Sequence, residues 1–165
     1  MPVKDINHLP QFEKMLKELV SKKIYVGVFK EDDAELSKIL SVHEYGATIP
    51  VSDSMRRYMA AVGFPLKKST TVLRIPERAP LRKSMEHTEE IENIIQTAVS
   101  KAAENYDSKK AMNYIGRSMV RLVQKVINSN LEPALHPMTI REKGSSVSLI
   151  GKTKKLVNGI VYKIK

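Results

Sequence analysis

The chain has 165 residues, of which 42% are hydrophobic and 28% are charged, a composition that suits one folded domain with a buried core. It contains no cysteine, which excludes disulfides, thiol nucleophiles and cysteine-based zinc sites. The net charge is +10. Residues 51–85 hold eight basic and two acidic side chains, and residues 133–165 hold seven and one. Such segments attract nucleic acid, acidic membranes or acidic proteins, and charge alone does not choose among them.

The first part of the chain predicts two helices with a strand between them. Apolar residues at three- and four-residue spacing predict a helix over about residues 9–20, and the β-branched and aromatic run at 24–29 predicts a strand. Gly46 is placed to end the second helix in a left-handed conformation. Asp32 or Asp33 can cap that helix at its start, and its core-facing residues are Leu36, Ile39, Leu40 and His43.

The middle of the chain predicts short elements and then a long helix. A loop or short extended piece covers residues 47–53, a helix covers 53–62 and a second strand covers 71–76. Pro76 and Pro80 stiffen the approach to the long helix, which we expect over about residues 81–106.

The last third of the chain begins with a second long helix and then changes character. This helix is expected over about residues 111–128, with Asp107 or Ser108 as its cap. Residues 129–148 contain two prolines and no clean period, which predicts a long and mostly extended loop. A short helix at 152–158 and a final strand complete the chain.

These elements together predict an α+β fold in a single domain that spans residues 1–165. A small and mostly antiparallel sheet would pack against the two long helices. A basic insertion at 51–71 and the Pro-rich loop at 129–148 would project from this framework. The expected fold is therefore a compact base with two long loops.

His43 and Glu44 raise the question of a zinc hydrolase. The zincin pattern needs a second histidine four residues after the first, and position 47 is an alanine. The remaining histidines are far apart in the sequence. We therefore expect His43 to pack on the inner edge of its helix and Glu44 to face solvent, and we keep a metal-dependent hydrolase centred on His43 and Glu44 only as a remote alternative.

Other catalytic and cofactor motifs are incomplete. No G-x-S-x-G elbow occurs, and "GKT" at 151–153 is preceded by Ser146 where a phosphate-binding loop needs glycine. The acidic pairs lie in polar stretches and suit solvated helix starts better than a catalytic dyad. We predict no enzyme activity, no catalytic residue, no cofactor and no metal site.

The basic residues of segment 51–85 are the candidate contact residues. They could be a solvated surface, a contact for an acidic partner protein or a contact for DNA phosphates. No recognised nucleic-acid-binding module is present. The candidates are Arg56, Arg57, Lys67, Lys68, Arg74, Arg78, Arg82 and Lys83.

Four motifs resemble those of one protein family in the same order. The stretch "IPERAPLR" at 75–82 is similar to the Ile-Pro-x-Arg-Pro-Phe-Leu-Arg signature of bacteriophage tail-completion proteins, and "SVHEYGATIP" at 41–50 is similar to the helix end that precedes it. Two long helices follow in the family. The segments "HPMTIREKGSS" at 136–146 and "LIGKTKKLVNGIVYKI" at 149–164 resemble the last two motifs, although Gly151, Lys152 and Thr153 stand where the family has Asp-Thr-Gly.

The resemblance implies a structural protein of the virion, in the group also labelled head–tail joining, minor tail, virion morphogenesis or neck proteins. Such a protein completes the tail or joins it to the head connector. It would work as a ring of identical subunits in contact with the connector or neck and with tail tube or terminator proteins. A head-to-tail ring needs two different matching patches, and we expect the basic loop and the Pro-rich loop to supply interface. A basic DNA-binding protein remains the alternative.

Within the motifs, Glu44, Gly46, Pro76 and Arg78 are expected to be structural. Arg78 and Arg82 project near a helix start, where the helix dipole does not favour positive charge. They could instead pair with Glu44, with Glu77 or with an acidic residue of a neighbouring subunit.

The sequence also bears on localisation. The N-terminus lacks the apolar core of a signal peptide, and no apolar run approaches the roughly 20 residues that span a bilayer. We expect a soluble protein with no membrane partner, made in the host cytoplasm and located in the virion at the head–tail interface or tail.

Overall fold

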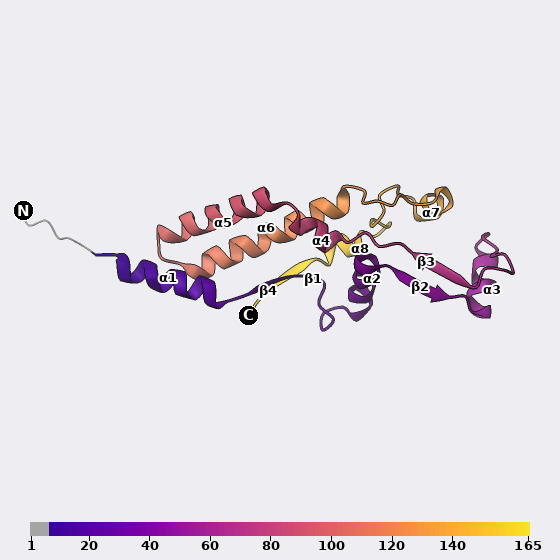
Figure 1. Ribbon diagram of the computed structural model, residues 1–165, viewed down its shortest axis with the longest axis horizontal. Helices are drawn as coiled ribbons and strands as arrows, with labels where there is room; N and C mark the ends of the chain where they lie inside the picture. The colour runs from indigo at the N-terminus through magenta and orange to yellow at the C-terminus, as the bar shows by residue number, and fades with distance from the viewer. Residues whose placement is uncertain (1–6) are drawn as a thin grey trace, which may run out of the picture.

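The computed structural model describes residues 7–165, and these form an elongated α+β structure with eight helices and four short strands (Figure 1). Helices α5 (Thr88–Ala103) and α6 (Ser108–Asn128) lie side by side and form the body. Helix α1 (Leu9–Ser21) packs against α6 near the turn that joins α5 to α6. Because α6 also contacts the strands beside it, it is the central element of the fold.

Two strands from opposite ends of the chain pair next to α6. Strand β1 (Ile24–Gly27) runs antiparallel to β4 (Val161–Ile164), with Ile24 opposite Ile164. The backbones of Lys23 and Lys165 exchange hydrogen bonds of 2.7 and 3.0 Å and extend this pairing by one position. The last segment of the chain is thereby fixed against the first strand.

The main core lies between α6, α2 (Ala34–Tyr45) and the C-terminal segment. Helix α2 is capped by Asp33, whose Oδ1 accepts from the Leu36 amide at 2.8 Å, and it ends at Gly46 with a φ of 71°. The predicted first and last positions of this helix are confirmed, whereas Gly46, with a ψ of 171°, has a positive φ but does not adopt the left-handed helical conformation that was expected. The core side chains are Leu36, Leu40, Met119, Leu122, Val123, Val126, Ile127, Leu131, Leu149, Leu156 and Ile160.

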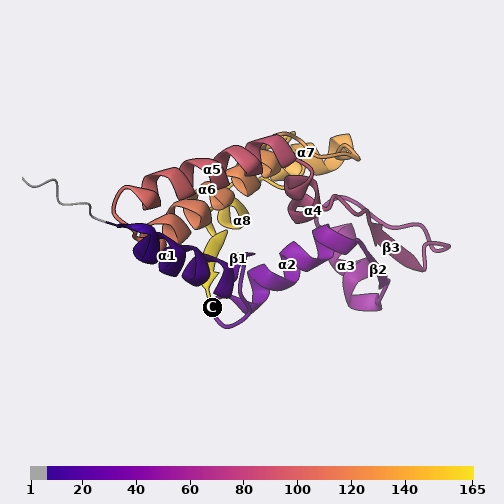
Figure 2. The same ribbon diagram turned by 60° about the vertical axis from the view of Figure 1, so that its left-hand side comes forward.

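A second strand pair projects from the body beyond α2 (Figures 1 and 2). Strand β2 (Ala47–Pro50) pairs antiparallel with β3 (Val72–Ile75), and helix α3 (Asp53–Ala61) lies between them in sequence. We call residues 47–75 the basic arm. Two short helices occur later in the chain. Helix α7 (Pro137–Lys143) lies near the arm, and α8 (Lys155–Asn158) precedes β4.

The structure confirms the α+β class and corrects several predicted elements. The strands form two separate pairs rather than one sheet, because α2 lies between them. The predicted helix 81–106 is two helices, α4 (Pro80–Met85) and α5, which both contact α6, and α4 also contacts α2. The chain leaves the helical path at Glu86 and His87 between them. The predicted loop 129–148 contains α7, which begins at Pro137, a residue well suited to a first helical turn.

One further finding concerns membranes. Across residues 7–165, no helix has both the length and the apolar character needed to cross a bilayer.

Candidate functional site

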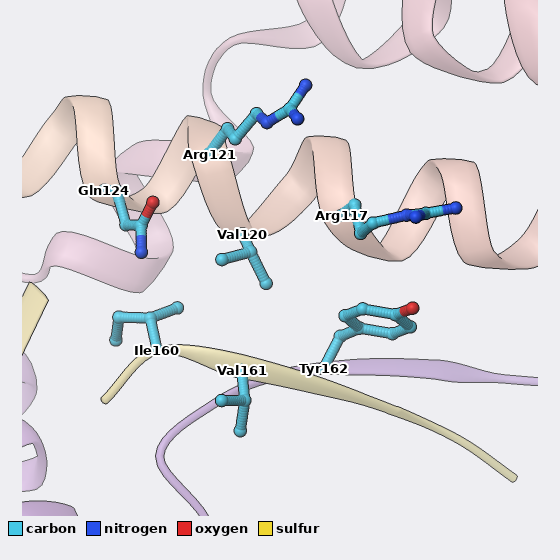
Figure 3. A pocket seen from close by; sticks show the side chains of 7 residues that line it. All are labelled: Arg117, Val120, Arg121, Gln124, Ile160, Val161 and Tyr162. Atoms are coloured by element: carbon cyan, nitrogen blue, oxygen red, sulfur yellow. The ribbon is translucent and has the colours of Figure 1, made fainter. Parts of the chain in front are cut away.

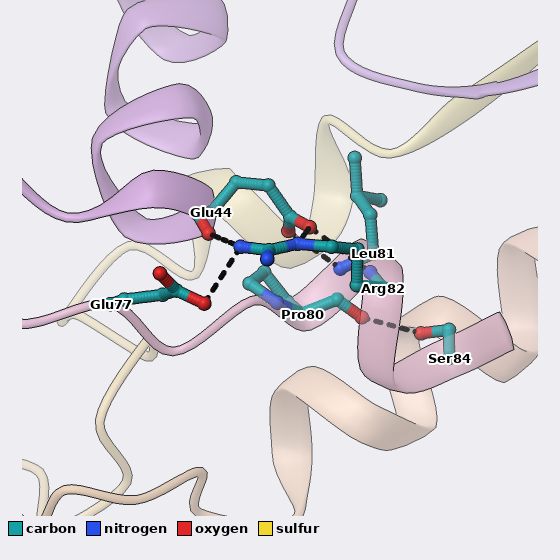
Figure 4. Close-up of polar contacts among 6 residues, drawn as sticks. All are labelled: Glu44, Glu77, Pro80, Leu81, Arg82 and Ser84. Atoms are coloured by element: carbon teal, nitrogen blue, oxygen red, sulfur yellow. Dashed lines mark hydrogen bonds and ion pairs between the residues drawn. The ribbon is translucent and has the colours of Figure 1, made fainter. Parts of the chain in front are cut away.

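The Glu44 carboxylate joins two distant parts of the chain. It lies at the end of α2 and is 4% exposed. Its Oε2 accepts from the Leu81 amide at 2.9 Å, and its Oε1 accepts from the Arg82 amide at 3.1 Å and from Arg82 Nε at 3.0 Å (Figure 4). Since the N-cap residue Ala79 has only a methyl side chain and cannot accept a hydrogen bond, Glu44 supplies the acceptors for the amides of Leu81 and Arg82 in the first turn of α4.

Arg82 extends this contact to residues 76–78, which follow β3 and which we call the stem of the basic arm. Its Nη2 donates to Glu77 Oε1 at 2.8 Å and also to the Glu44 carbonyl oxygen, and its guanidinium lies 5.3 Å from the centre of the Tyr45 ring. The hydrogen bond with Glu44 raises the pKa of Arg82. We call Glu44, Glu77, Arg82 and the first turn of α4 the Glu44 anchor.

This geometry corrects the predicted exposure of Glu44, which is buried. Both carboxylate oxygens already accept hydrogen bonds from α4, so neither is directed at a metal or a substrate. Among the residues that the structure describes, no group of three His, Cys, Asp or Glu side chains could hold a metal ion. The arrangement of Glu44 therefore suits a structural carboxylate at a helix start rather than a hydrolytic centre.

Arg78 links the stem of the arm to the Pro-rich segment, which we define as residues 129–148. The Arg78 side chain is buried, with 4% exposure, and its Nη2 donates to the Pro133 carbonyl oxygen at 2.9 Å. Its backbone amide donates to the His43 carbonyl oxygen at 2.8 Å. The predicted pairing with Glu44 and Glu77 is confirmed for Arg82 and is wrong for Arg78, which reaches a carbonyl oxygen instead. A pairing of Arg78 with an acid of a neighbouring subunit stays a prediction.

His43 is the titratable group in this linkage. Burial, together with the positive charges of Arg78 and Lys143, lowers the pKa of His43 to about 4. Within residues 7–165, His43 Nδ1 is buried without a hydrogen-bond partner, as is Arg78 Nε. A neutral His43 at neutral pH is the physical consequence. The expected packing of His43 on the inner side of its helix agrees with this environment.

Acid should therefore weaken the fold through His43. The unfolded histidine titrates near pH 6.5, so between pH 6.5 and 4 the unfolded chain binds more protons than the folded one. The free energy of unfolding should fall by on the order of 2 kcal/mol across this window, after allowance for partial solvent exposure. Urea unfolding at several pH values should show a flatter profile for His43→Gln, and His87→Gln, an exposed histidine, should keep the wild-type slope.

The basic residues of segment 51–85 that were candidates for partner contact have different roles in the structure. Arg56 donates to the carbonyl oxygens of Leu66, Lys67 and Thr70 at 3.3, 2.8 and 2.9 Å, so it holds the loop of the arm together. Lys83 is half-buried at α4. Four members are exposed and make no ion pair within residues 7–165: Arg57, Lys67, Lys68 and Arg74.

The arm and the Pro-rich segment also meet at the far end of the arm. Side chains of α3 and the loop after it face α7 across a hollow of about 370 Å³. The hollow is lined by Tyr58, Met59, Val62, Phe64, His136, Thr139 and Glu142. The two segments that were predicted to supply interface thus lie together at one end of the molecule.

A separate groove of about 360 Å³ lies between α6 and β4 (Figure 3). Val120 and Ile160 point into it, and the Arg121 guanidinium points away. Beside it, the Tyr162 ring packs on Gly116, and its hydroxyl hydrogen-bonds Asn113 Oδ1 at 2.9 Å. The lining residues offer no nucleophile paired with a base, and we assign this contact to the attachment of β4.

The sequence predicted where the backbone turns near the Glu44 anchor but not the contacts within it. Gly46 ends α2 as predicted and Pro76 directly follows β3, whereas the roles of Arg56, Arg78 and Arg82 depend on contacts that no local pattern gives. One signal was present: "RAPLR" starts a helix with no capping side chain, which indicates an acceptor from elsewhere. Comparisons of the chain with protein-family models, curated proteins and solved structures find no match.

Proposed function

We propose that the protein is a structural component of a bacteriophage virion that completes the tail or joins it to the head connector, assembled as a ring of identical subunits. One observation carries the proposal. The two strongest motifs of the family resemblance, at 41–50 and 75–82, are far apart in sequence and meet at the Glu44 anchor (Figure 4). Motifs that build one contact are expected to occur together in a family.

The arm supports an assembly role on physical grounds. Its stem is fixed by the Glu44 anchor and by Arg78, whereas its surface carries exposed cations without ion pairs in the described part of the chain. A rigid stem with a charged and partly apolar surface suits docking onto another protein, since little order is lost on binding. The same surface requires no catalytic step.

Location in the virion tests this proposal. Antibody labelling of virions from an encoding phage should place the protein at the head–tail junction or the tail in electron micrographs. Its gene should lie between those of the portal and the major tail protein. Virions that lack the protein, or a gene far from any phage structural gene, would contradict the proposal.

A second candidate function is DNA binding, which the four exposed cations of the arm favour. If Arg57, Lys67, Lys68 and Arg74 contact phosphates, the logarithm of the binding constant should fall with the logarithm of salt concentration with a slope of about −3 to −4. Gel shifts of duplex DNA at two salt concentrations measure this slope. Weak binding with no such slope would leave the assembly role as the better account.

A further inference from the structure

An apolar groove runs along the body beside β1. Its volume is about 450 Å³, and its lining comes from β1, α2, α4, α5 and α6. Most of the lining is apolar, chiefly Ile24, Val26, Leu81, Met85, Ile91 and Ile95, and Glu44 and Arg82 of the Glu44 anchor border it at one end. Met85 is 59% exposed and Ile95 is 44% exposed. Apolar side chains that gather in an open groove mark a surface that another element covers.

The same groove is bordered by an unpaired strand edge. Because the Lys23 and Lys165 backbones exchange hydrogen bonds, the antiparallel pattern puts Tyr25 in the next hydrogen-bonded pair and directs the backbone groups of Ile24 and Val26 away from β4. No strand within residues 7–165 pairs with that edge. A new strand placed there would gain main-chain hydrogen bonds and would lie over the apolar side chains.

The basic arm carries a strand edge that matches. The Val51 amide donates to the Thr71 carbonyl oxygen, so the pattern directs the backbone groups of Val72 and Arg74 outward from the arm. The outer edge of β2 is different, because Pro50 stands opposite Val72 and has no N–H to offer there. Strand β3 is therefore the edge of the arm that can pair with another strand, and Val72 on it is 40% exposed.

The charges at the two surfaces are opposite. Glu86, Glu89 and Glu92 are exposed at the end of α4 and the start of α5, close in sequence to the groove residues Met85 and Ile91, and they make no ion pair within the described residues. The arm presents its four exposed cations. At the groove itself the charged lining residues are Glu44 and Arg82, which already pair with each other.

We propose that the groove receives the basic arm of a second copy of this chain. Strand β3 of the incoming arm pairs along β1, which makes a four-stranded sheet in the order β4, β1, β3, β2 with two strands from each copy. The cations of the arm then face Glu86, Glu89 and Glu92. An arm does not reach the groove of its own chain, since its stem is fixed at the Glu44 anchor and projects away from β1 (Figures 1 and 2).

This contact joins two different surfaces, so each copy offers one arm and one groove. Head-to-tail contacts of this kind generate closed rings or filaments, according to the rotation between neighbours. The inference rests on the proposed function only for the closure into a ring; the pairing of arm and groove stands on the edges, the apolar lining and the charges.

Carbodiimide cross-linking of the full chain tests the contact directly, because it joins a lysine to a carboxylate that already touches it. Equal amounts of unlabelled and ¹⁵N-labelled protein are mixed and cross-linked, and mixed-isotope peptides identify links between copies. We expect Lys67 or Lys68 joined to Glu86, Glu89 or Glu92, in mixed-isotope form. The same lysines linked mainly to other surfaces, or no mixed-isotope links at all, would overturn the inference.

Three variants, one of them a control, sharpen the test. Ile95→Asp puts a charge in the groove and should lower the yield of these links about tenfold. Ile39→Asp, at an exposed apolar residue of α2 that does not line the groove, is its matched control and should leave the yield unchanged. Val72→Pro removes the outward N–H of β3 and should lower the yield as well. Equal yields for all three variants would overturn the inference.

The outcomes separate this inference from the proposed function. Links between copies at a surface other than the groove would remove the arm–groove pairing and leave a ring in the virion intact. Links at the groove, in a protein that antibodies do not find in virions, would keep the pairing and remove the phage role.

Discussion

Glu44→Gln should lower the free energy of unfolding by about 2–3 kcal/mol. The carboxylate accepts from two amides of α4 with its two oxygens, and an amide side chain has only one oxygen to offer. The new NH₂ group would face either the Leu81 or the Arg82 amide, donor against donor, in a position that is 4% exposed. The first turn of α4 would lose an acceptor and Arg82 its buried partner.

Urea unfolding followed by far-ultraviolet circular dichroism measures this change, and amide hydrogen exchange at Leu81 and Arg82 locates it. Glu77→Gln is the matched control, because Glu77 binds the same guanidinium from a side chain that is 52% exposed. Its effect should stay below about 1 kcal/mol. If Glu44→Gln and Glu77→Gln lowered the free energy of unfolding equally, burial of Glu44 would not be the reason for its contribution to stability.

Gly116→Ala should destabilise the protein although alanine favours helices. A Cβ at this position would lie 2.2 Å from Tyr162 Cδ2 and 2.6 Å from Cε2, in the middle of α6. Overpacking of this kind costs about 1–3 kcal/mol, which exceeds the gain of about 1 kcal/mol in helix propensity. A Tyr162 ring that moved aside would lose the hydrogen bond from its hydroxyl to Asn113 Oδ1.

The destabilisation by Gly116→Ala should disappear or reverse when the Tyr162 ring is absent. In a Tyr162→Ala background, Gly116→Ala should be neutral or stabilising by up to about 1 kcal/mol, because the helix gains and nothing clashes. Thermal unfolding of the four proteins in this cycle measures the coupling. Gly151→Ala, at a glycine with no heavy atom within 4 Å of the added carbon, should change little. A destabilisation that persists without the ring would contradict the assigned contact.

Features that depend on neighbouring residues were predictable from the sequence. Asp33 and Asp107 cap α2 and α6 as their positions before apolar periodic runs indicated, and Gly46 ends α2 at a positive φ. These caps need only residues within three or four positions. The lengths of α1 and α6 were also predictable, because each helix buries one apolar face and its residues recur at three- and four-residue spacing.

Features that depend on distant residues were not predictable. The sequence gives Glu44 a polar helix end and no sign that α4, 37 positions later, needs its oxygens. Nothing local to Gly116 indicated that the Tyr162 ring, from the last strand, packs against it. The expectation of one sheet failed in the same way, because strand order depends on where α2 lies.

The Arg78 side chain links two segments that are far apart in the sequence. One buried guanidinium touches the stem of the arm and the Pro-rich segment, and the Pro-rich segment is held again where the Ser148 hydroxyl donates to the Leu131 carbonyl oxygen at 2.7 Å. Through hydrogen bonds of one buried side chain, Arg78 therefore ties the base of the arm at Pro76 to Pro133 of the Pro-rich segment, so the position of each segment depends on that of the other.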